Sequence, residues 1–123
     1  MGSYRDLDIY QKAHQLGLDC HHVSMELPKY ELYETGSQLR RASKSVSANI
    51  VEGYGRRRYK AEFIKHLIYS HASCDETIEW LTYISTLHPA ISDKVQPLME
   101  LANITGSSIN KFIQSVIKTH NEF

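Results

Sequence analysis

Four stretches of the sequence repeat apolar residues at alternating spacings of three and four, and this pattern constrains the fold more than any other feature. Spacings of this kind put one apolar stripe along an α-helix, and they are typical of helices that pack nearly antiparallel with a left-handed twist. No segment alternates with a period of two over the length of a strand. The sequence therefore predicts an all-α protein that folds as an antiparallel up-down-up-down left-handed four-helix bundle. The four apolar stripes run over Ile9–Leu27, Leu39–Gly53, Phe63–Ser85 and Val95–Val116.

Residues that begin or end helices separate these stripes. Pro28 cannot continue a helix that precedes it. Thr35 and Gln38 have the spacing of a capping box, and Ser92 is the predicted N-cap of the last helix. We expect Gly55 to adopt a left-handed conformation that ends the second helix. The predicted helices span about residues 6–27, 36–54, 59–87 and 93–119 of a single domain over residues 1–123, with a loop at 28–35.

The composition fits one globular domain outside the membrane. Of the 123 residues, 41% are hydrophobic and 23% are charged, close to the average for globular proteins. No apolar run approaches the ~18 residues that a transmembrane helix needs, and the first residues lack the apolar core of a signal peptide. We therefore expect a cytoplasmic protein with no membrane partner. Cys20 and Cys74 both fall on predicted core stripes, so we expect them to be reduced core thiols.

No residue pattern predicts catalysis, a cofactor or a metal. The seven histidines form no His-x-x-x-His or Glu-x-x-His pair, and the two cysteines form no Cys-x-x-Cys pair. His66 and His71 lie five residues apart and therefore point in different directions on a helix. Gly53-Tyr54-Gly55 lacks the preceding strand and the full glycine pattern of a phosphate-binding loop. We expect a protein that is not an enzyme and that has no catalytic residues, no cofactor and no metal.

Positive charge gathers in the middle of a chain whose formal net charge is zero. Residues 36–66 carry eight basic and two acidic side chains, whereas residues 1–35 and 67–123 each carry three basic and six acidic ones. Arginine donates two parallel hydrogen bonds to a phosphate, and tyrosine can stack on an unpaired base. We expect one exposed patch that binds RNA or DNA. Its candidate nucleic-acid-binding residues are Arg40, Arg41, Lys44, Arg56, Arg57, Arg58, Tyr59 and Lys60.

The same basic residues have a second interpretation. Acidic side chains on neighbouring helices or on another subunit could neutralise them, and the zero net charge favours this interpretation because nucleic-acid binders are usually basic overall. The protein would then be an interaction scaffold with a protein partner and without a nucleic-acid ligand. The sequence leaves both interpretations open.

Two predicted helices, the first and the third, carry more apolar surface than one bundle buries. A bundle helix needs one buried face, and tyrosine, tryptophan and methionine are enriched at interfaces between proteins. We therefore expect a homo-oligomer. The alternative is a wide core stripe flanked by partly exposed aromatic side chains. The candidate interface residues are Tyr10, His14, Leu18, His21, Met25, Tyr69, Trp80 and Tyr83.

Several segments carry a resemblance to a known family. They are Tyr4-Arg5-Asp6-Leu7, Gly36 to Ala42, Ser45 to Arg57 with its Asn49-Ile50-x-Glu52-Gly53 core and the following Gly55-Arg56, and Glu62-Phe63-Ile64. On these residues the chain resembles the bacterial four-helix bundle proteins known as 23S rRNA intervening-sequence proteins, which are related to the accessory variability protein of diversity-generating retroelements. The resemblance implies a homopentamer of four-helix bundles with no established catalytic activity. It also implies a relative that binds nucleic acid and a reverse transcriptase.

The motif within this resemblance has a structural interpretation. It lies where the second predicted helix ends. We expect Asn49 and Glu52 to make hydrogen bonds that fix the turn into the third helix, with Glu52 anchoring Arg56 or Arg57. This role is structural and not catalytic. The motif residues are Asn49, Glu52, Gly53 and Gly55.

Overall fold

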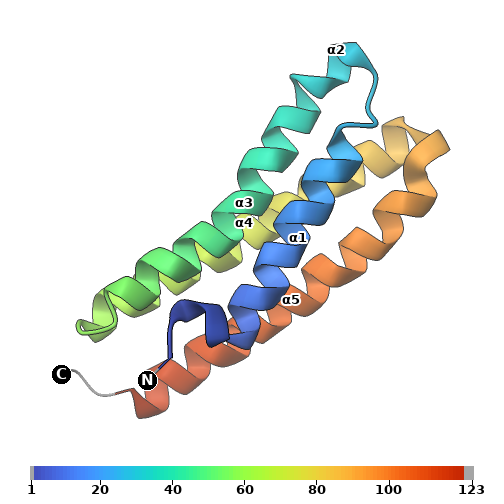
Figure 1. Ribbon diagram of the computed structural model, residues 1–123. Helices are drawn as coiled ribbons and strands as arrows, with labels where there is room; N and C mark the ends of the chain where they lie inside the picture. Colours follow the sequence, from blue (N-terminus) through green and yellow to red (C-terminus); the bar gives the residue numbers. More distant parts are fainter. Residues whose placement is uncertain (1, 121–123) are drawn as a thin grey trace.

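The computed structural model describes residues 2–120, and within this range the chain forms helices and no strand. The long helices are α1 (Asp8–Ser24), α3 (Thr35–Gly55), α4 (Lys60–Leu87) and α5 (Ser92–Thr119) (Figure 1). The short ones are the 3-10 helix η1 (Tyr4–Asp6), the single turn α2 (Lys29–Leu32) and the 3-10 helix η2 (Pro89–Ile91). The predicted all-α class and the four long helices are confirmed.

Each long helix packs against two others. The neighbouring pairs are α1 with α3, α3 with α4, α4 with α5, and α5 with α1 (Figure 1). At one end of the molecule, Arg40 near the start of α3 donates to the hydroxyl of Ser24, the last residue of α1. At the other end, Lys60 at the start of α4 donates to the carbonyl of Ile117 near the end of α5. Consecutive long helices therefore run in opposite directions, whereas the left-handed twist stays a prediction.

The core lies between the four long helices and contains most residues of the predicted apolar stripes. Leu16, Leu39, Leu67 and Ile109 are fully buried, and each comes from a different long helix. Burial of an aliphatic side chain of this size contributes about 1.5–3 kcal/mol relative to its exposure to water. The hydrophobic effect over one shared core thus holds the four helices together.

The apolar stripe of α4 differs from the predicted one in its second half. The predicted stripe continues through Ile78 and Ser85, but Thr77 and Ile84 are the buried residues in the structure. After Cys74 the buried positions of α4 keep the alternation of three and four, which holds the stripe on one side of the helix. The Thr77 hydroxyl is satisfied in the core because it donates to the Ser73 carbonyl one turn earlier, at 2.8 Å.

Both cysteines are free and buried, as predicted. Burial raises the pKa of the Cys20 thiol to about 12 and that of the Cys74 thiol to about 11. The Cys74 thiol also donates to the Ala102 carbonyl at 3.1 Å and so joins α4 to α5. Both thiols therefore stay protonated at neutral pH, and neither is a nucleophile in the folded protein.

Three predicted helix ends are wrong. The Thr35 side chain caps nothing; instead the Thr35 amide donates to the Glu31 carboxylate at 3.4 Å, so α2 supplies the group that satisfies the start of α3. Gly55 belongs to α3, and no glycine among the described residues has a positive φ. Ser92 is the first residue of α5 rather than its N-cap, and its hydroxyl hydrogen bonds with that of Ser85 at 2.9 Å.

The segment predicted as the loop 28–35 contains the helical turn α2. The first helix ends at Ser24, three residues before the predicted end, and Leu27 is buried beyond it. Pro28 then lies at the N-cap of α2, where its missing N–H breaks no hydrogen bond. The chain therefore reverses direction through a short helix rather than through an irregular loop.

The last helix is continuous through two residues that disfavour helices. Pro97 lies within α5, in its second turn. Gly106 is buried where α5 packs on α4, and a Cβ there would lie 3.6 Å from the Cys74 sulfur, an ordinary contact distance. The close packing of α4 on α5 therefore does not require glycine at this position.

Candidate nucleic-acid interface

The eight predicted nucleic-acid-binding residues separate into two groups at opposite ends of α3. Arg40, Arg41 and Lys44 lie near the start of this helix, whereas residues 56–59 follow its end and Lys60 begins α4. Residue 40 and the last residue of α3 are separated by roughly 22 Å along a helical rise of about 1.5 Å per residue. The structure therefore does not place the eight residues in one patch within a single chain.

Most of the basic residues at the α3–α4 turn have partners. Arg56 forms ion pairs with Glu52 at 2.8 Å and with Glu62 at 3.2 Å, and these carboxylates raise its pKa. Lys60 donates to a backbone carbonyl of α5 at 2.8 Å. Arg58 is exposed and forms no ion pair within the described residues. The turn thus offers far less free positive charge than its sequence suggests.

Two tyrosines flank the basic residues of this turn, and one of them contacts Arg57. The Arg57 guanidinium lies 4.0 Å above the centre of the Tyr54 ring and donates to the Tyr54 carbonyl at 2.9 Å. Such a cation–π contact is worth about 0.5–1 kcal/mol where it is exposed to water. Tyr59 is exposed. Of the residues of this turn, Arg58 and Tyr59 are the two left to meet a ligand.

Two residues of the structural motif make hydrogen bonds near this corner. Asn49 donates to the carbonyl and to the hydroxyl of Ser45, each at 3.0 Å, and its carbonyl lies 3.4 Å from the His66 ring of α4. Glu52 accepts a hydrogen bond from Arg56 at 2.8 Å, which is the anchoring contact that the sequence suggested. Because Glu52 and Arg56 are each about half exposed, water screens this ion pair, and its main effect is on the position of the Arg56 side chain.

The two glycines of the motif should respond differently to alanine. A Cβ at Gly53 would lie 3.0 Å from the His66 Cβ and 3.3 Å from the Phe63 carbonyl oxygen, so α3 and α4 would have to separate. Nothing lies within 4 Å of a Cβ at Gly55. We expect Gly53→Ala to lower the free energy of unfolding by about 1–2 kcal/mol despite the better helix propensity of alanine.

The matched control is Gly55→Ala, which should leave stability unchanged or raise it by up to about 1 kcal/mol. Urea unfolding followed by circular dichroism measures both variants. Equal effects of the two substitutions would mean that the α3–α4 contact at Gly53 is not tight.

Arg40 is a structural residue rather than an exposed one. One nitrogen of its half-buried guanidinium donates to the Ser24 hydroxyl at 2.8 Å, and another donates to the Leu32 carbonyl at 2.9 Å. These two bonds join the start of α3 to the end of α1 and to α2. Arg41 and Lys44, by contrast, are exposed and have no ion-pair partner among the described residues.

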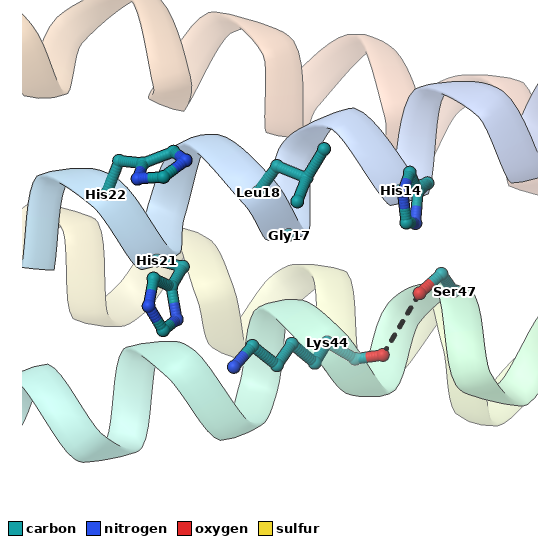
Figure 2. Close-up of a pocket in the computed structure, with 7 residues that line it drawn as sticks. All are labelled: His14, Gly17, Leu18, His21, His22, Lys44 and Ser47. Carbon is teal, nitrogen blue, oxygen red and sulfur yellow. Dashed lines mark hydrogen bonds between the residues drawn. The ribbon is translucent and has the colours of Figure 1, made fainter.

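A groove of about 430 Å³ lies between α1 and α3, and its lining includes Lys44, one of these unpaired cations, together with three histidines (Figure 2). From α1, His21 points toward α3, and the Lys44 side chain extends along α3 in the direction of His21 (Figure 2). Leu18 is 44% exposed on the α1 wall. The residues that line the groove are His14, Gly17, Leu18, His21, His22, Lys44 and Ser47.

The groove is electropositive, and its lining contains no carboxylate. Partial burial, followed by the positive charges of Lys44, Arg40 and His22, lowers the pKa of His21. The part of this lowering that comes from Lys44, Arg40 and His22 shows that basic groups lie close to His21. An anionic group in the groove would relieve the repulsion among them.

Sequence reasoning found part of this groove but gave it another role. His14, Leu18 and His21 were expected in an oligomer interface, and Lys44 was expected in a nucleic-acid patch. Gly17, His22 and Ser47 were not singled out, although their helical spacing from the other lining residues puts them on the same faces. Only the pairing of α1 with α3 brings the two sets of residues together.

The other predicted interface residues form a separate surface. Tyr69, Trp80 and Tyr83 lie on α4, and the two tyrosines are about half exposed. The Trp80 ring lies 5.8 Å from that of Tyr83, and its N–H donates to Glu76 at 3.0 Å. On α1, Met25 is exposed, whereas Tyr10 is partly buried against the core.

Residues 2–120 show neither a metal-ligand cluster nor a membrane-spanning helix. No three histidine, cysteine, aspartate or glutamate side chains between residues 2 and 120 gather closely enough to hold a metal ion. None of the helices in this range is both long enough and apolar enough to cross a membrane.

The fold and these surfaces define an all-helical protein of four long helices with a cationic groove between two of them. The chain belongs to the 23S rRNA-intervening sequence protein family, which it matches over residues 5–111. No curated protein matches it. A solved structure of a protein of unknown function from the S23 ribosomal protein family, from Bacteroides thetaiotaomicron, is similar to it with a TM-score of 0.67 and 22% identity, covering 90% of this chain and 99% of that chain. At this identity the likeness supports the fold alone.

Proposed function

We propose that this protein is a non-enzymatic, self-associating helical bundle that binds RNA or another nucleic acid. The observation that carries the proposal is the set of cations on α3 and at its end that have no acidic partner. Both carboxylates of residues 36–66, those of Glu52 and Glu62, contact Arg56 or Lys65, and Arg41, Lys44 and Arg58 have no ion pair within the described part of the chain. Exposed and unpaired cations attract polyanions, and binding releases condensed counterions from the nucleic acid.

Self-association in this proposal uses the aromatic flank of α4. The half-exposed Tyr69 and Tyr83, with the partly buried Trp80 beside Tyr83, resemble the anchor residues of protein interfaces. The proposal takes the assembly to be a pentamer of left-handed up-down-up-down bundles in the cytoplasm, as the family resemblance implies. Repetition of a weak nucleic-acid site around such an assembly would raise the overall affinity.

The second candidate function is an interaction scaffold without a nucleic-acid ligand. One observation favours it: Arg56 is already neutralised by Glu52 and Glu62, which is the charge pairing that this interpretation expects. The pairing extends to one arginine of the turn and does not include the cations near the start of α3. The nucleic-acid proposal therefore accounts for more of the charge distribution.

A titration of labelled oligonucleotides at two salt concentrations tests the proposed function. We expect fluorescence anisotropy to detect binding of single-stranded RNA at low salt, with an affinity that falls steeply as salt is added, because each phosphate contact contributes about 0.7 to the logarithmic salt slope of a single strand. Light scattering on the same sample should give a mass several times that of one chain. A well-formed oligomer that binds neither RNA nor DNA at low salt would favour the scaffold.

A further inference from the structure

We propose that the groove between α1 and α3 binds single-stranded nucleic acid, with phosphates against His21, His22 and Lys44 and an unpaired base against Leu18. This inference rests on the proposed function and gives it a site. It also moves the site away from the arginine-rich turn, where the sequence placed it. The four side chains line one groove in the structure (Figure 2).

The charge of the groove favours an anionic ligand. Lys44 has no ion-pair partner within residues 2–120, and no carboxylate is among the lining residues. The nearest acidic neighbour of His22 on α1 is Asp19, one turn earlier, and its carboxylate accepts a hydrogen bond from Gln15 at 2.8 Å. A cationic surface without a carboxylate in its lining is complementary to a polyanion.

The width of the groove favours a single strand. The axes of two packed helices lie about 8–10 Å apart, so a groove between them admits an unpaired base or one strand of backbone but not a double helix. His14 and His22 stand roughly 12 Å apart along α1, which gives room for more than one phosphate. Leu18 lies between them, 44% exposed, and offers an apolar surface to the face of a base.

A second copy of this chain is the competing occupant of the groove. A symmetric contact between two such grooves would bring His21, His22 and Lys44 of both copies together, and like charges would repel. A second copy could occupy the groove only with a different and acidic surface. That alternative changes the mass of the assembly when the groove is altered, so the experiment distinguishes it.

Binding in this groove should depend on pH. Histidine side chains change charge between pH 5 and 8, so the groove gains positive charge as the pH falls. The groups that face His21 are His22 on its own helix and Arg40 and Lys44 on α3, all of which are cationic or can become so. A bound phosphate favours protonated histidine, and because the pKa of His21 lies below its ordinary value of 6.5, affinity should rise mainly as the pH falls below that value.

The experiment compares double-alanine variants with the unaltered protein, using a fluorescein-labelled oligouridine at low salt. The groove variant is His21→Ala with Lys44→Ala, and the turn variant is Arg57→Ala with Arg58→Ala. The control is Lys111→Ala with Lys118→Ala, which replaces two exposed cations of α5 that lie outside both candidate surfaces. We expect the groove variant to bind at least tenfold more weakly, as the loss of about two charge contacts predicts, and to lose most of its pH dependence. The control should bind within a few-fold of the unaltered protein. Lys44→Glu is a second groove variant, and circular dichroism and light scattering check that each variant folds and assembles.

Each remaining outcome has a definite meaning. Loss of binding in the turn variant with full binding in the groove variant would overturn the groove site while the proposed function survives. A groove variant with an altered assembly mass would assign the groove to a contact between copies and overturn the inference. No oligouridine or oligodeoxythymidine binding by the unaltered protein would reject the proposed function and this inference together.

Discussion

Replacement of Arg40 by alanine is expected to lower the free energy of unfolding by about 2–4 kcal/mol, whereas Arg41→Ala should change it by less than about 0.5 kcal/mol. The two arginines are adjacent in the sequence, but their surroundings differ. The Arg40 guanidinium donates to the hydroxyl of Ser24, which is fully buried, and to the Leu32 carbonyl. Arg41 is exposed, and no hydrogen bond or ion pair of its side chain is present in the structure.

The cost of removing Arg40 has two parts. A hydrogen bond from a charged donor contributes about 1.5–3 kcal/mol, and a buried acceptor that loses its donor also loses its hydration. The second part is the junction itself, because no other side chain joins the end of α1, the turn α2 and the start of α3 through hydrogen bonds within the described residues. Arg40→Lys should also destabilise the protein, since an ammonium group lacks the planar fork that reaches both acceptors.

Urea unfolding of the two alanine variants by circular dichroism measures the difference. If Arg40→Ala proved as stable as Arg41→Ala, the junction would not depend on the guanidinium, and Arg40 would return to the set of residues available to a ligand. The comparison also affects binding assays. Loss of RNA binding by an Arg40 variant is uninterpretable unless the variant is shown to fold.

The sequence predicted the helices well because the information that specifies them is local. The alternation of three and four along each helix needs only the chain itself, and it identified all four long helices. The second half of α4 was misassigned because Ile78 is more apolar than its neighbour Thr77, and a stripe through Ile78 and Leu81 reaches Ser85 instead of the buried Ile84. Thr77 and Ile84 are buried because they continue the alternating spacing of three and four, which keeps the buried residues on one side of α4.

The candidate site could be predicted less well because it depends on pairing between helices. The sequence alone does not distinguish the surroundings of two arginines. The Arg40 guanidinium donates to a buried hydroxyl sixteen residues earlier in the chain, whereas the adjacent Arg41 is exposed to solvent. The juxtaposition of His21 with Lys44 arises only when α1 packs on α3. Local patterns therefore gave the residue types of an electropositive surface but not their grouping.

The contact between Glu31 and His88 leads to a second large effect. Glu31 lies in α2 and is buried, and its carboxylate is 3.3 Å from the His88 ring, which follows α4, and 3.4 Å from the Thr35 amide. We expect Glu31→Gln to lower the free energy of unfolding at pH 6 by roughly 1–3 kcal/mol, because the Thr35 amide and the His88 ring lose a charged acceptor. Glu34→Gln is the matched control, since Glu34 is exposed three residues further along the chain.

The contribution of Glu31 to the free energy of unfolding should decrease as the pH falls. Burial alone raises the pKa of the Glu31 carboxyl, but hydrogen bonds from Thr35 and His88, with the charge of His88, outweigh burial and hold the pKa below its ordinary value of 4.5. The unfolded chain therefore takes up this proton at a higher pH than the folded protein does. Stability from this group is complete above about pH 4.5 and is lost as the pH falls through the lower pKa of the folded state.

Urea unfolding of the protein and of Glu31→Gln across the range from pH 6 to pH 3 measures this effect. The difference in unfolding free energy between the two should be largest near neutral pH and should shrink in acid, because glutamine has no proton to gain. Glu34→Gln should follow the unaltered protein throughout. A difference that stays constant from pH 6 to pH 3 would show that Glu31 contributes through packing rather than through its charge. In that case the turn α2 would be held to the end of α4 by shape and not by the pair with His88.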